Sequence, residues 1–358
     1  MSEGLRVFLV GGGTGGHLTP ALGLAEALED AGHETFFLLG GREVEQAYVG
    51  ADRRSAGLGF EPSRLPRPLA LLRAMSRARR HAMHWRPQAT IALGGAASAA
   101  ALGVPYAPLI LLEGNYVAGR SVRWMQRFAH ATLTMYADTA EQVVRGRQVG
   151  PLPRRSLAAM DAAEARRSLG LHPDRPVLLT LGGSQGAADV NRAAAELMPE
   201  LRARGWQLLA LTGAGRVAEV LDDIEDFDDV EEVPEGMPSD LVVRGHCDAM
   251  GAAYAAADFV LSRGGASTLG ELWVTQVPGM VLPYPHHKDR QQERNARALE
   301  PGLLCHAHFD EEAREQLLAC LDDAARRAEM AASLAAAGPA DGRAAAVAAV
   351  EEIVASAK

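Results

Sequence analysis

Apolar runs and segments of helical periodicity alternate along the chain. The apolar run at residues 6–10 leads into the glycine-rich stretch 11–16 (GGGTGG), and a helical pattern of apolar positions follows over 20–28. The same order of strand, glycine-rich loop and helix recurs half a chain later, over residues 176–201. This repetition predicts two α/β domains of the nucleotide-binding type.

Further short apolar runs predict the remaining strands. They lie at residues 35–39, 90–93, 109–112, 132–135, 207–211, 259–262 and 278–282. Helical or loop-rich stretches separate them, which favours parallel pairing through right-handed crossovers. The uncharged stretch 87–112 is interrupted by glycine and proline and predicts strand, helix and strand in a buried interior rather than a membrane span. The expected fold class is therefore α/β, with two Rossmann-like domains, parallel sheets flanked by helices and a cleft between the domains.

Two features suggest where the domains divide. Prolines at 151 and 153 forbid a continuing helix and predict a linker over 150–154. The alanine-rich tail after Pro339 predicts a last helix. The length of 358 residues is enough for about two domains of ordinary size.

Composition narrows the class of protein. With 48% apolar and 23% charged residues, the chain is that of a folded protein and not of a disordered or fibrous one. A formal charge of −9 argues against a protein that coats nucleic acid. Cys247, Cys305 and Cys320 are too few and scattered for a disulfide framework or a metal knuckle, which indicates a reducing, cytoplasmic compartment.

The charge is unevenly distributed. Nine acids and no bases occupy residues 222–235, where Asp226 and Asp228 imitate a metal-binding DxD motif but are expected to be solvated surface. Residues 62–112 contain seven arginines and no acid. Within this segment apolar positions recur at helical spacing, with arginines beside them. The pattern fits a basic amphipathic helix on an anionic membrane, or an ordinary surface helix that packs its apolar stripe on the domain.

The first glycine loop is a candidate binding site. Its glycines at 11, 13 and 16 match the dinucleotide fingerprint, but no acid ends the second predicted strand, which runs into Gly40 and Gly41. His17 follows the glycines directly. From its position it either caps the start of the helix or serves as a general base in a cleft.

The second half holds a denser polar cluster. Residues 262–271 (SRGGASTLGE) predict a strand end, a turn and a helix start that Thr268 is able to cap. One interpretation is a plain helix cap with an acid near the positive end. The alternative is that the amides and Thr268 bind a pyrophosphate while Glu271 binds a ribose diol. Gln291 and Gln292, in the polar stretch that follows, suit sugar hydroxyls.

Four motifs carry a resemblance to a known family. They are GGGTGGH (11–17), GGSQGA (182–187), SRGGASTLGE (262–271) and HKDRQQ (287–292), with Asp248, Met250 and the stretch 252–254 before the third. In this order, over nearly the whole chain, the sequence resembles the MurG family of peptidoglycan glycosyltransferases. Its members transfer N-acetylglucosamine from UDP-N-acetylglucosamine to undecaprenyl-pyrophosphoryl-N-acetylmuramyl-peptide.

The resemblance implies a glycosyltransferase of the B architecture. Residues 1–153, with the last helix at about 340–358, would form an acceptor and membrane-associating domain, and residues 154–339 the UDP-sugar donor domain. The reaction would be inverting at the acceptor's 4-hydroxyl, would need no cofactor or built-in metal, and would serve cell wall synthesis, cell shape and division. The enzyme would be peripheral, on the cytoplasmic face of the plasma membrane.

The resemblance also assigns residues. His17 is expected to act as the base or to orient it, Glu113 to be a second catalytic residue, and Arg263 to meet charge on the leaving UDP. The expected donor-binding residues are Thr14, Gly15, Gly16, Asn115, Arg154, Ser184, Cys247, Arg263, Ala266, Ser267, Thr268, Leu269, Gly270, Glu271, Gln291 and Gln292. The expected membrane patch consists of Leu72, Arg73, Met75, Arg77, Arg80 and Trp85.

The acceptor half departs from the family pattern. The usual His-Glu-Gln-Asn is Leu-Glu-Gly-Asn at 112–115, a tyrosine expected after the paired glycines is Ala96, and the linker reads Gly-Pro-Leu-Pro-Arg. The alternatives that stay open are a related UDP-sugar transferase with a different acceptor, a non-catalytic UDP-sugar binder and a sugar-nucleotide epimerase. A dehydrogenase is disfavoured by the missing second-strand acid.

Overall fold

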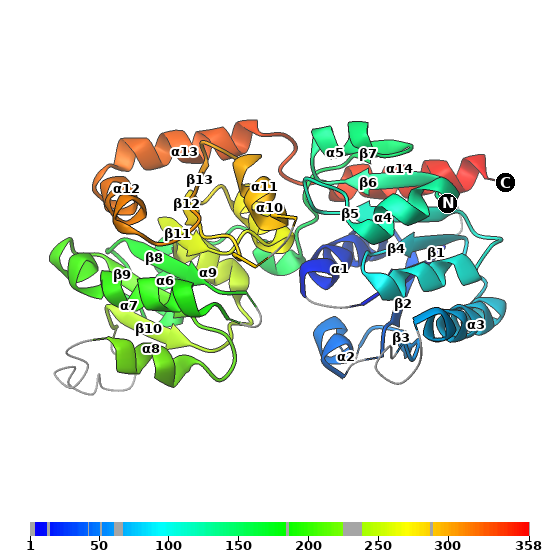
Figure 1. The fold of residues 1–358 in the computed structure, drawn as a ribbon, viewed down its shortest axis with the longest axis horizontal. Helices are drawn as coiled ribbons and strands as arrows, with labels where there is room; N and C mark the ends of the chain where they lie inside the picture. The colour runs from blue at the N-terminus through cyan, green and yellow to red at the C-terminus, as the bar shows by residue number, and fades with distance from the viewer. Residues whose placement is uncertain are drawn as a thin grey trace. The chain divides into compact units, whose positions relative to one another are not determined.

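The computed structural model describes residues 4–12, 15–41, 43–50, 52–60, 67–183, 186–224, 238–286 and 289–357. The chain divides into two compact units, an N-terminal unit of Met1–Arg155 with Pro339–Lys358 and a C-terminal unit of Ser156–Gly338. Each unit is a parallel sheet with helices on both faces, and Figure 1 shows their elements. The predicted acidic run lies mostly outside the described residues, as do Asp226 and Asp228.

Among the described residues, the N-terminal unit holds a seven-stranded parallel sheet in the order β3-β2-β1-β4-β5-β6-β7. The strands are β1 Arg6–Gly11, β2 Glu34–Leu39, β3 Ser55–Gly57, β4 Ala89–Ala92, β5 Leu109–Glu113, β6 Ala131–Thr134 and β7 Gly146–Gln148. The central strands β4 and β5 are buried along their whole length, because helices cover both faces of the sheet. The strand order reverses at β1, so the carboxyl ends of β1 and β4 form the switch point where α/β sheets bind ligands.

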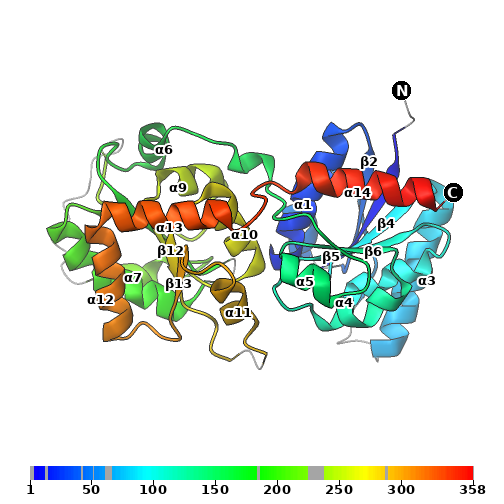
Figure 2. The same cartoon turned by 90° about the horizontal axis from the view of Figure 1, so that it is seen from above.

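Two helical layers cover this sheet (Figure 2). The first contains α1 (Gly15–Asp30) and the C-terminal helix α14 (Arg343–Ser356), which share one core cluster. The second contains α3 (Arg67–Trp85), the 3-10 helix η1 (Ala96–Gly103) and α4 (Arg120–Met125), which share another. The remaining short helices are α2 Glu43–Val49, η2 Gln126–Phe128 and α5 Ala137–Gln142. The helix predicted between the strands of 87–112 is therefore a 3-10 helix.

In the described part of the C-terminal unit, the sheet has six parallel strands in the order β10-β9-β8-β11-β12-β13. The strands are β8 Val177–Leu181, β9 Gln207–Leu211, β10 Leu241–Arg244, β11 Phe259–Ser262, β12 Gly279–Val281 and β13 Leu303–Cys305. The helices are η3 Arg155–Leu157, α6 Ala162–Leu169, α7 Ala188–Ala203, α8 Val217–Asp223, α9 Met250–Ala256, α10 Ala266–Thr275, α11 Gln291–Arg297, α12 Glu311–Asp322 and α13 Ala324–Ala336. Here the order reverses at β8, next to β11.

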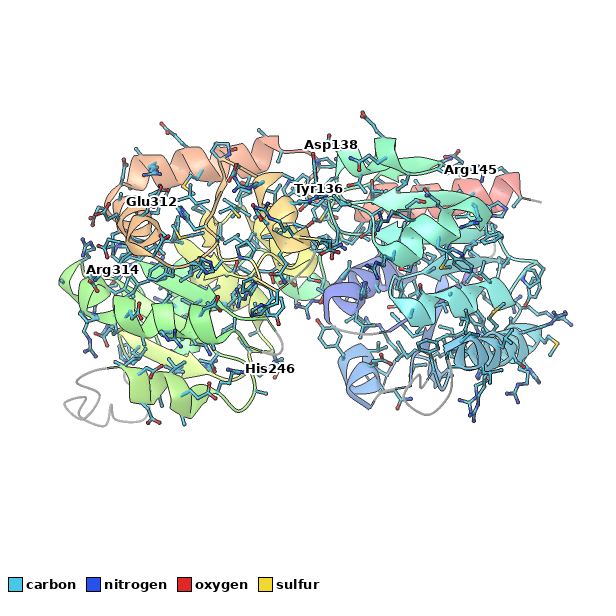
Figure 3. The ribbon with its side chains drawn as sticks, viewed as in Figure 1. Tyr136, Asp138, Arg145, His246, Glu312 and Arg314 are labelled. Carbon is cyan, nitrogen blue, oxygen red and sulfur yellow. The ribbon has the colours of Figure 1, made fainter. Side chains whose placement is uncertain are left out.

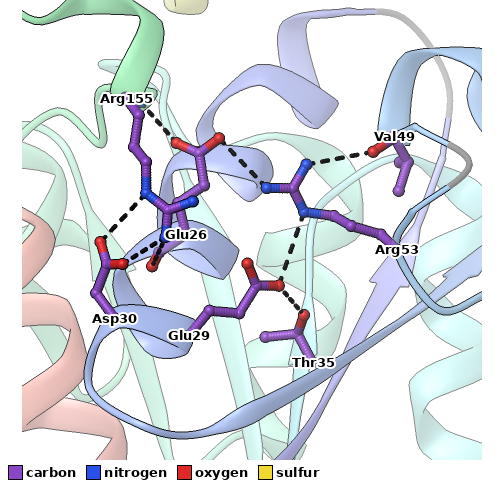
Figure 4. A network of polar contacts seen from close by, with 7 residues as sticks. All are labelled: Glu26, Glu29, Asp30, Thr35, Val49, Arg53 and Arg155. Carbon is purple, nitrogen blue, oxygen red and sulfur yellow. Dashed lines mark hydrogen bonds and ion pairs between the residues drawn. The ribbon is translucent and has the colours of Figure 1, made fainter.

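The chain segments that join the units lie side by side in the N-terminal unit. The amide of Gly342 donates to the carbonyl of Pro151 at 2.8 Å. Arg155 is tied to α1, since its backbone amide donates to Glu26 at 2.6 Å and its guanidinium pairs with Asp30. Arg53 reaches the same Glu26 carboxylate at 3.4 Å (Figure 4). The predicted linker is therefore anchored at its end rather than loose.

The structure divides the residues of the expected membrane patch between two sides of α3. The alanines at 70, 74, 78 and 82 are fully buried, and the Trp85 ring stacks on Phe8 with centroids 5.0 Å apart. For Trp85, Ala78 and Ala82, the interpretation as a surface helix that packs its apolar side on the domain is therefore the correct one. Leu72, Arg73 and Arg80 are exposed, while Met75 and Arg77 are half-buried. Across the described residues, no helix is long and apolar enough to cross a membrane.

Candidate functional site

His17 lies in the first turn of α1, after β1 and the first glycine loop. Its ring rests on the paired glycines that follow β4: a Cβ atom on Gly94 would lie 2.7 Å from His17 Cδ2. Gly94 and Gly95 have φ values of 97° and 73°, which glycine adopts without strain. Gly15 and Gly16 begin α1, and Thr14 lies outside the described residues. The geometry thus places an imidazole at the switch point of the sheet.

The environment of His17 keeps its imidazole neutral. Burial lowers the pKa of His17 below its ordinary value of 6.5, because desolvation disfavours the charged ring. Its Nδ1 atom is buried and has no hydrogen-bond partner among the described residues, so this nitrogen does not cap the helix. A neutral imidazole at this position can accept a proton.

Glu113, at the end of β5, organises the loop that follows. Its side chain is buried, and both carboxylate oxygens accept hydrogen bonds: Oε1 from the backbone and side-chain amides of Asn115 at 2.9 and 2.8 Å, and Oε2 from the Gly119 amide at 2.6 Å. Burial raises the pKa of Glu113, and these hydrogen bonds partly oppose that increase. The carboxylate therefore fixes Asn115 in place.

Two neighbouring side chains brace the same loop from α5. Thr139 Oγ1 donates to the carbonyl of Tyr116 at 2.7 Å. The Tyr116 hydroxyl donates to Asp138, and its ring meets Tyr136 edge-on at 5.5 Å. Figure 3 labels Tyr136 and Asp138. The loop between β5 and α4 is thus held from both of its sides.

Glu45 is a site feature that the sequence did not reveal. Its buried carboxylate accepts a hydrogen bond from the Gly41 amide at 2.9 Å. A Cβ on Gly12 would lie 2.6 Å from its Oε1 atom. The dinucleotide fingerprint places an acid at the end of the second strand, whereas this acid comes from α2 and folds back against the first glycine loop. No local spacing indicated this, because contact between Glu45 and Gly12 depends on the packing of separate segments.

In the C-terminal unit, α10 begins directly after the turn that follows β11. Its N-cap is Gly265, and no side chain caps the helix start. The prediction that Thr268 caps the helix is therefore wrong: Thr268 is the third helical residue, because the chain turns earlier, at the paired glycines 264 and 265. A helix start without a side-chain cap presents its positive end to an anion.

Glu271 lies in the second turn of α10 and is buried with Tyr254 of α9. Their exposed fractions are 8% and 1%, and the Tyr254 hydroxyl donates to Glu271 Oε2 at 2.9 Å. This bond fixes the orientation of a carboxylate that burial would otherwise destabilise. Leu269 and Gly270, which precede Glu271 in α10, are buried as well.

Arg263 acts as a brace at the end of β11. Its Nη1 donates to the carbonyls of Leu282 and Pro283 at 2.9 and 3.1 Å, and its Nη2 pairs with Asp189 of α7. The guanidinium also lies 5.7 Å from the centre of the Tyr284 ring. These contacts join the end of β11 to the first turn of α7 and to the loop after β12.

The start of α11 packs against the same turn. A Cβ on Gly264 would lie 2.4 Å from the Gln292 carbonyl oxygen, and the buried Asn295 donates to the Gly264 carbonyl at 3.3 Å. The Gln292 side chain accepts from the Tyr284 amide at 2.8 Å, and Gln291 opens α11. The structure thus gathers the predicted residues of α10 and α11 around Gly264.

Two further predicted residues that the structure describes lie on other segments of the chain. Cys247 is buried before α9, and Arg154 is half-buried in the linker. Ser184, His287 and Lys288 lie outside the described residues. Among the predicted site residues that the structure describes, His17 lies at the first glycine loop, Glu113 and Asn115 lie at the end of β5, and the largest group surrounds the start of α10.

The fold defines the class of protein. Two parallel α/β units, each with a glycine loop at its first strand, form the B architecture of glycosyltransferases, as predicted. The crystal structure of MurG from Acinetobacter baumannii matches 97% of this chain and 99% of its own with a TM-score of 0.73 and 21% identity. The calicheamicin glycosyltransferase CalG4 matches with a TM-score of 0.63 and 16% identity, over 99% of both chains.

Family models and relatives narrow the class. Residues 7–134 match the glycosyltransferase family 28 N-terminal domain, and residues 177–348 match the glycosyltransferase family 28 C-terminal domain. A relative from Acidothermus cellulolyticus is 34% identical, over 94% of this chain and 95% of its own, and one from Paenarthrobacter aurescens is 31% identical, over 92% and 91%. Both are named UDP-N-acetylglucosamine--N-acetylmuramyl-(pentapeptide) pyrophosphoryl-undecaprenol N-acetylglucosamine transferase.

The chain belongs to glycosyltransferase family 28, within the group of MurG enzymes. The family resemblance, the fold class and the assignment as a hexosyltransferase are thereby confirmed.

Proposed function

We propose that the chain transfers N-acetylglucosamine from UDP-N-acetylglucosamine to the 4-hydroxyl of undecaprenyl-pyrophosphoryl-N-acetylmuramyl-peptide in peptidoglycan synthesis. The observation that carries the proposal is the match of the whole chain to transferases of that name, over more than 90% of both lengths. The two groups of polar residues described above support it, because each stands where its sheet changes strand order.

The C-terminal unit would bind the donor. The positive end of α10, with Ala266, Ser267 and Thr268, would hold the diphosphate. Buried Glu271 would accept hydrogen bonds from the ribose hydroxyls. The remaining donor contacts of this unit would come from Ser184, Cys247 through its backbone, Leu269, Gly270, Gln291 and Gln292.

Arg263 has a different role in this proposal from direct charge neutralisation. Its guanidinium is already engaged by Asp189 and two carbonyls, so it would position the diphosphate-binding turn. Charge that develops on the leaving UDP would be stabilised mainly by the amides of the α10 start.

The N-terminal unit would complete the reaction. Neutral His17 would take the proton of the acceptor's 4-hydroxyl as this oxygen attacks the anomeric carbon from the face opposite UDP. The bond from that carbon to the diphosphate oxygen breaks, and UDP leaves with the bonding electron pair. Glu113 would position Asn115 toward the donor, while Thr14, Gly15, Gly16 and Arg154 would make further donor contacts.

A membrane role follows from the lipid acceptor. We propose that the enzyme is peripheral on the cytoplasmic face of the plasma membrane, attached through the exposed side of α3. Leu72, Arg73 and Arg80 are exposed there, and Met75 and Arg77 are partly so. Trp85 stacks on Phe8 and would support the helix from inside.

An assay of the purified protein with donor and acceptor tests the function. UDP should be released from UDP-N-acetylglucosamine only when the lipid acceptor, or a short-chain soluble analogue of it, is present. Glu271→Ala should weaken donor binding by about tenfold to a hundredfold, since it removes a charged hydrogen-bond acceptor worth roughly 1.5–3 kcal/mol. Glu219→Ala, an exposed acid of the same unit, is the control.

Two results would contradict the proposal. Transfer to another acceptor, with none to this one, would define a related UDP-sugar transferase. The observation that favours a different acceptor is the presence of Leu112 and Gly114, which replace the histidine and glutamine usual in the acceptor loop. Donor binding in calorimetry without turnover of any acceptor would indicate a non-catalytic binder.

A further inference from the structure

One long segment of the N-terminal unit is almost free of acids. Residues 62–137 contain ten arginines, and their only acid is Glu113. Glu113 is 4% exposed and bonded to its own loop, so the segment contributes no exposed carboxylate. The segment includes α3, η1 and α4, which cover the same face of the sheet (Figure 2). Their outer surface is therefore basic well beyond α3.

A cluster of exposed aromatic rings lies at the far end of this layer. Val122 and Met125 bury the inner side of α4, which leaves Trp124 and Phe128 exposed by 44% and 50%. Their ring centroids are 5.8 Å apart. The Arg127 guanidinium lies 5.8 Å from the Trp124 ring and 5.7 Å from the Phe128 ring. The cation therefore stands against two aromatic faces.

Hydrogen bonds hold this cluster together and connect it to the segment between α5 and β7. Arg127 Nε donates to the Trp124 carbonyl at 2.9 Å. Gln126 accepts a hydrogen bond from the amide of Val144, which is 48% exposed. Arg145, labelled in Figure 3, donates to the Ala129 carbonyl at 2.7 Å. We call Trp124, Arg127, Phe128 and Val144 the aromatic patch.

We propose that the aromatic patch is a second membrane contact, which sits in the headgroup region of an anionic bilayer. The inference rests on the proposed peripheral attachment and extends it from α3 to α4 and η2. Tryptophan and arginine suit this depth, because each combines an apolar body with a polar tip that stays in water. The ten arginines of residues 62–137, with no exposed acid among them, complement anionic lipid, whereas Asp138 and Glu141 of α5 lie on the Val144 side of the patch.

Charge also favours a membrane over a second copy of the chain. A symmetric dimer through this patch would bring the same arginine-rich surface of both copies together, which is repulsive. A second contact on the same helical layer as α3 would fix the orientation of the N-terminal unit on the membrane. Attachment through α3 alone would leave the unit free to rotate about that helix.

Tryptophan fluorescence with vesicles tests the proposal. The probes are vesicles of phosphatidylglycerol with phosphatidylcholine, vesicles of phosphatidylcholine alone, and the same lipids brominated on the acyl chains. Trp206 and Trp273 are 4% and 1% exposed and Trp85 stacks on Phe8, so Trp124 should dominate any response. Wild type should show a blue shift and bromine quenching with anionic vesicles, and Trp124→Phe should lose both.

Sedimentation with the same vesicles measures the strength of the contact. The double variant Trp124→Ala with Phe128→Ala should need about tenfold more anionic lipid for half-maximal binding, and Arg127→Gln a few-fold more. Met160→Ala, which removes a 45% exposed side chain from the C-terminal unit, is the matched control and should bind as wild type does. Circular dichroism and the unfolding midpoint identify any variant that is misfolded.

The outcomes separate this inference from the proposal on which it rests. If Leu72→Ser weakens vesicle binding while the aromatic-patch variants bind normally and Trp124 shows no quenching, the second contact is refuted and attachment through α3 stands. If wild type binds no anionic vesicles, both membrane proposals fail, while turnover of a soluble acceptor analogue still tests the transferase. A concentration-dependent dimer that the double variant abolishes would assign the patch to a second copy and overturn the inference.

Discussion

At the scale of single residues, the site depends on buried polar groups with assigned partners. Glu271 is held by Tyr254, Glu113 by Asn115 and Gly119, and Glu45 by the amide of Gly41. Each carboxylate loses its hydrating water on folding, and these hydrogen bonds offset part of the free-energy cost of that loss. Removing one partner takes a hydrogen bond from a carboxylate that stays buried, which costs more than the net value of a solvent-exposed bond.

Tyr254→Phe tests this argument. It removes the hydroxyl donor to buried Glu271 and should lower the free energy of unfolding by about 1–3 kcal/mol. It should also weaken UDP binding several-fold, if Glu271 holds the ribose. Urea unfolding and calorimetric titration with UDP measure the two effects.

The control is Tyr106→Phe. This substitution, at a 56% exposed tyrosine, should change stability by less than about 0.5 kcal/mol. Equal stability of the two variants would contradict the expectation.

The pH dependence of the reaction tests His17. A base must be neutral, and burial lowers the pKa of His17 below 6.5, so the acidic decline of kcat/KM should lie below pH 6.5. The same shift means that the unfolded chain binds more protons at this group, so its contribution to stability falls as pH drops below 6.5. His17→Gln should lower kcat by about 10²–10⁴-fold and abolish the decline. The exposed His308→Gln is the control; a decline that persists in His17→Gln would assign the base elsewhere.

At the scale of elements, burial sorts residues that spacing alone groups together. The apolar positions predicted on α3 recur at helical steps, yet Ala78 and Ala82 face the core while Leu72 faces outward. Alanine can occupy either side of a helix, so its spacing does not show which face packs. The arginines between them are compatible with both orientations. Only the position of the sheet decided the question.

The two glycines before α10 offer a matched pair of substitutions. Gly264→Ala would place a Cβ 2.4 Å from the Gln292 carbonyl oxygen, so α10 and α11 must separate. It should cost about 1–3 kcal/mol of stability and weaken donor binding. Gly265→Ala meets no atom within 4 Å and should cost at most about 1 kcal/mol. Thermal unfolding measures the stability of both variants. Equal losses of stability would show that close packing around Gly264 is not required.

At the scale of the whole molecule, the C-terminal helix belongs to the first unit. Buried side chains of α14, among them Val350 and Ile353, join the core formed by α1 and the sheet. The chain therefore enters the N-terminal unit twice, and the final helix must fold back before this core is complete. The C-terminal unit has its own separate core.

Val350→Asp tests that division. The substitution buries an unpaired charge beneath α14 and should destabilise the N-terminal unit by several kcal/mol. We expect calorimetry to show one transition moved to lower temperature while UDP still binds the C-terminal unit. Ala348→Asp, at an exposed position of the same helix, should behave as wild type. Loss of UDP affinity together with the transition would mean that the two units do not fold independently.

The central strands were predictable and several edge strands were not. Strands such as β5 and β8 are mostly apolar and buried at every position, because both faces of the sheet are covered. The edge strands β3 and β7 have three residues each and no apolar pattern, so only pairing with a neighbour defines them. The short strands β10 and β13 escaped prediction as well.

The sequence by itself determined the family, the two strand, glycine loop and helix openings, and the identity of most candidate residues. These depend on short stretches of chain, where glycine, helix starts and apolar runs act locally. The tertiary structure decided that Gly265 rather than Thr268 is the N-cap of α10, that Glu45 meets the first glycine loop, and that Trp85 packs inward. Burial and hydrogen-bond partners arise from segments distant in sequence, and therefore no local pattern contains them.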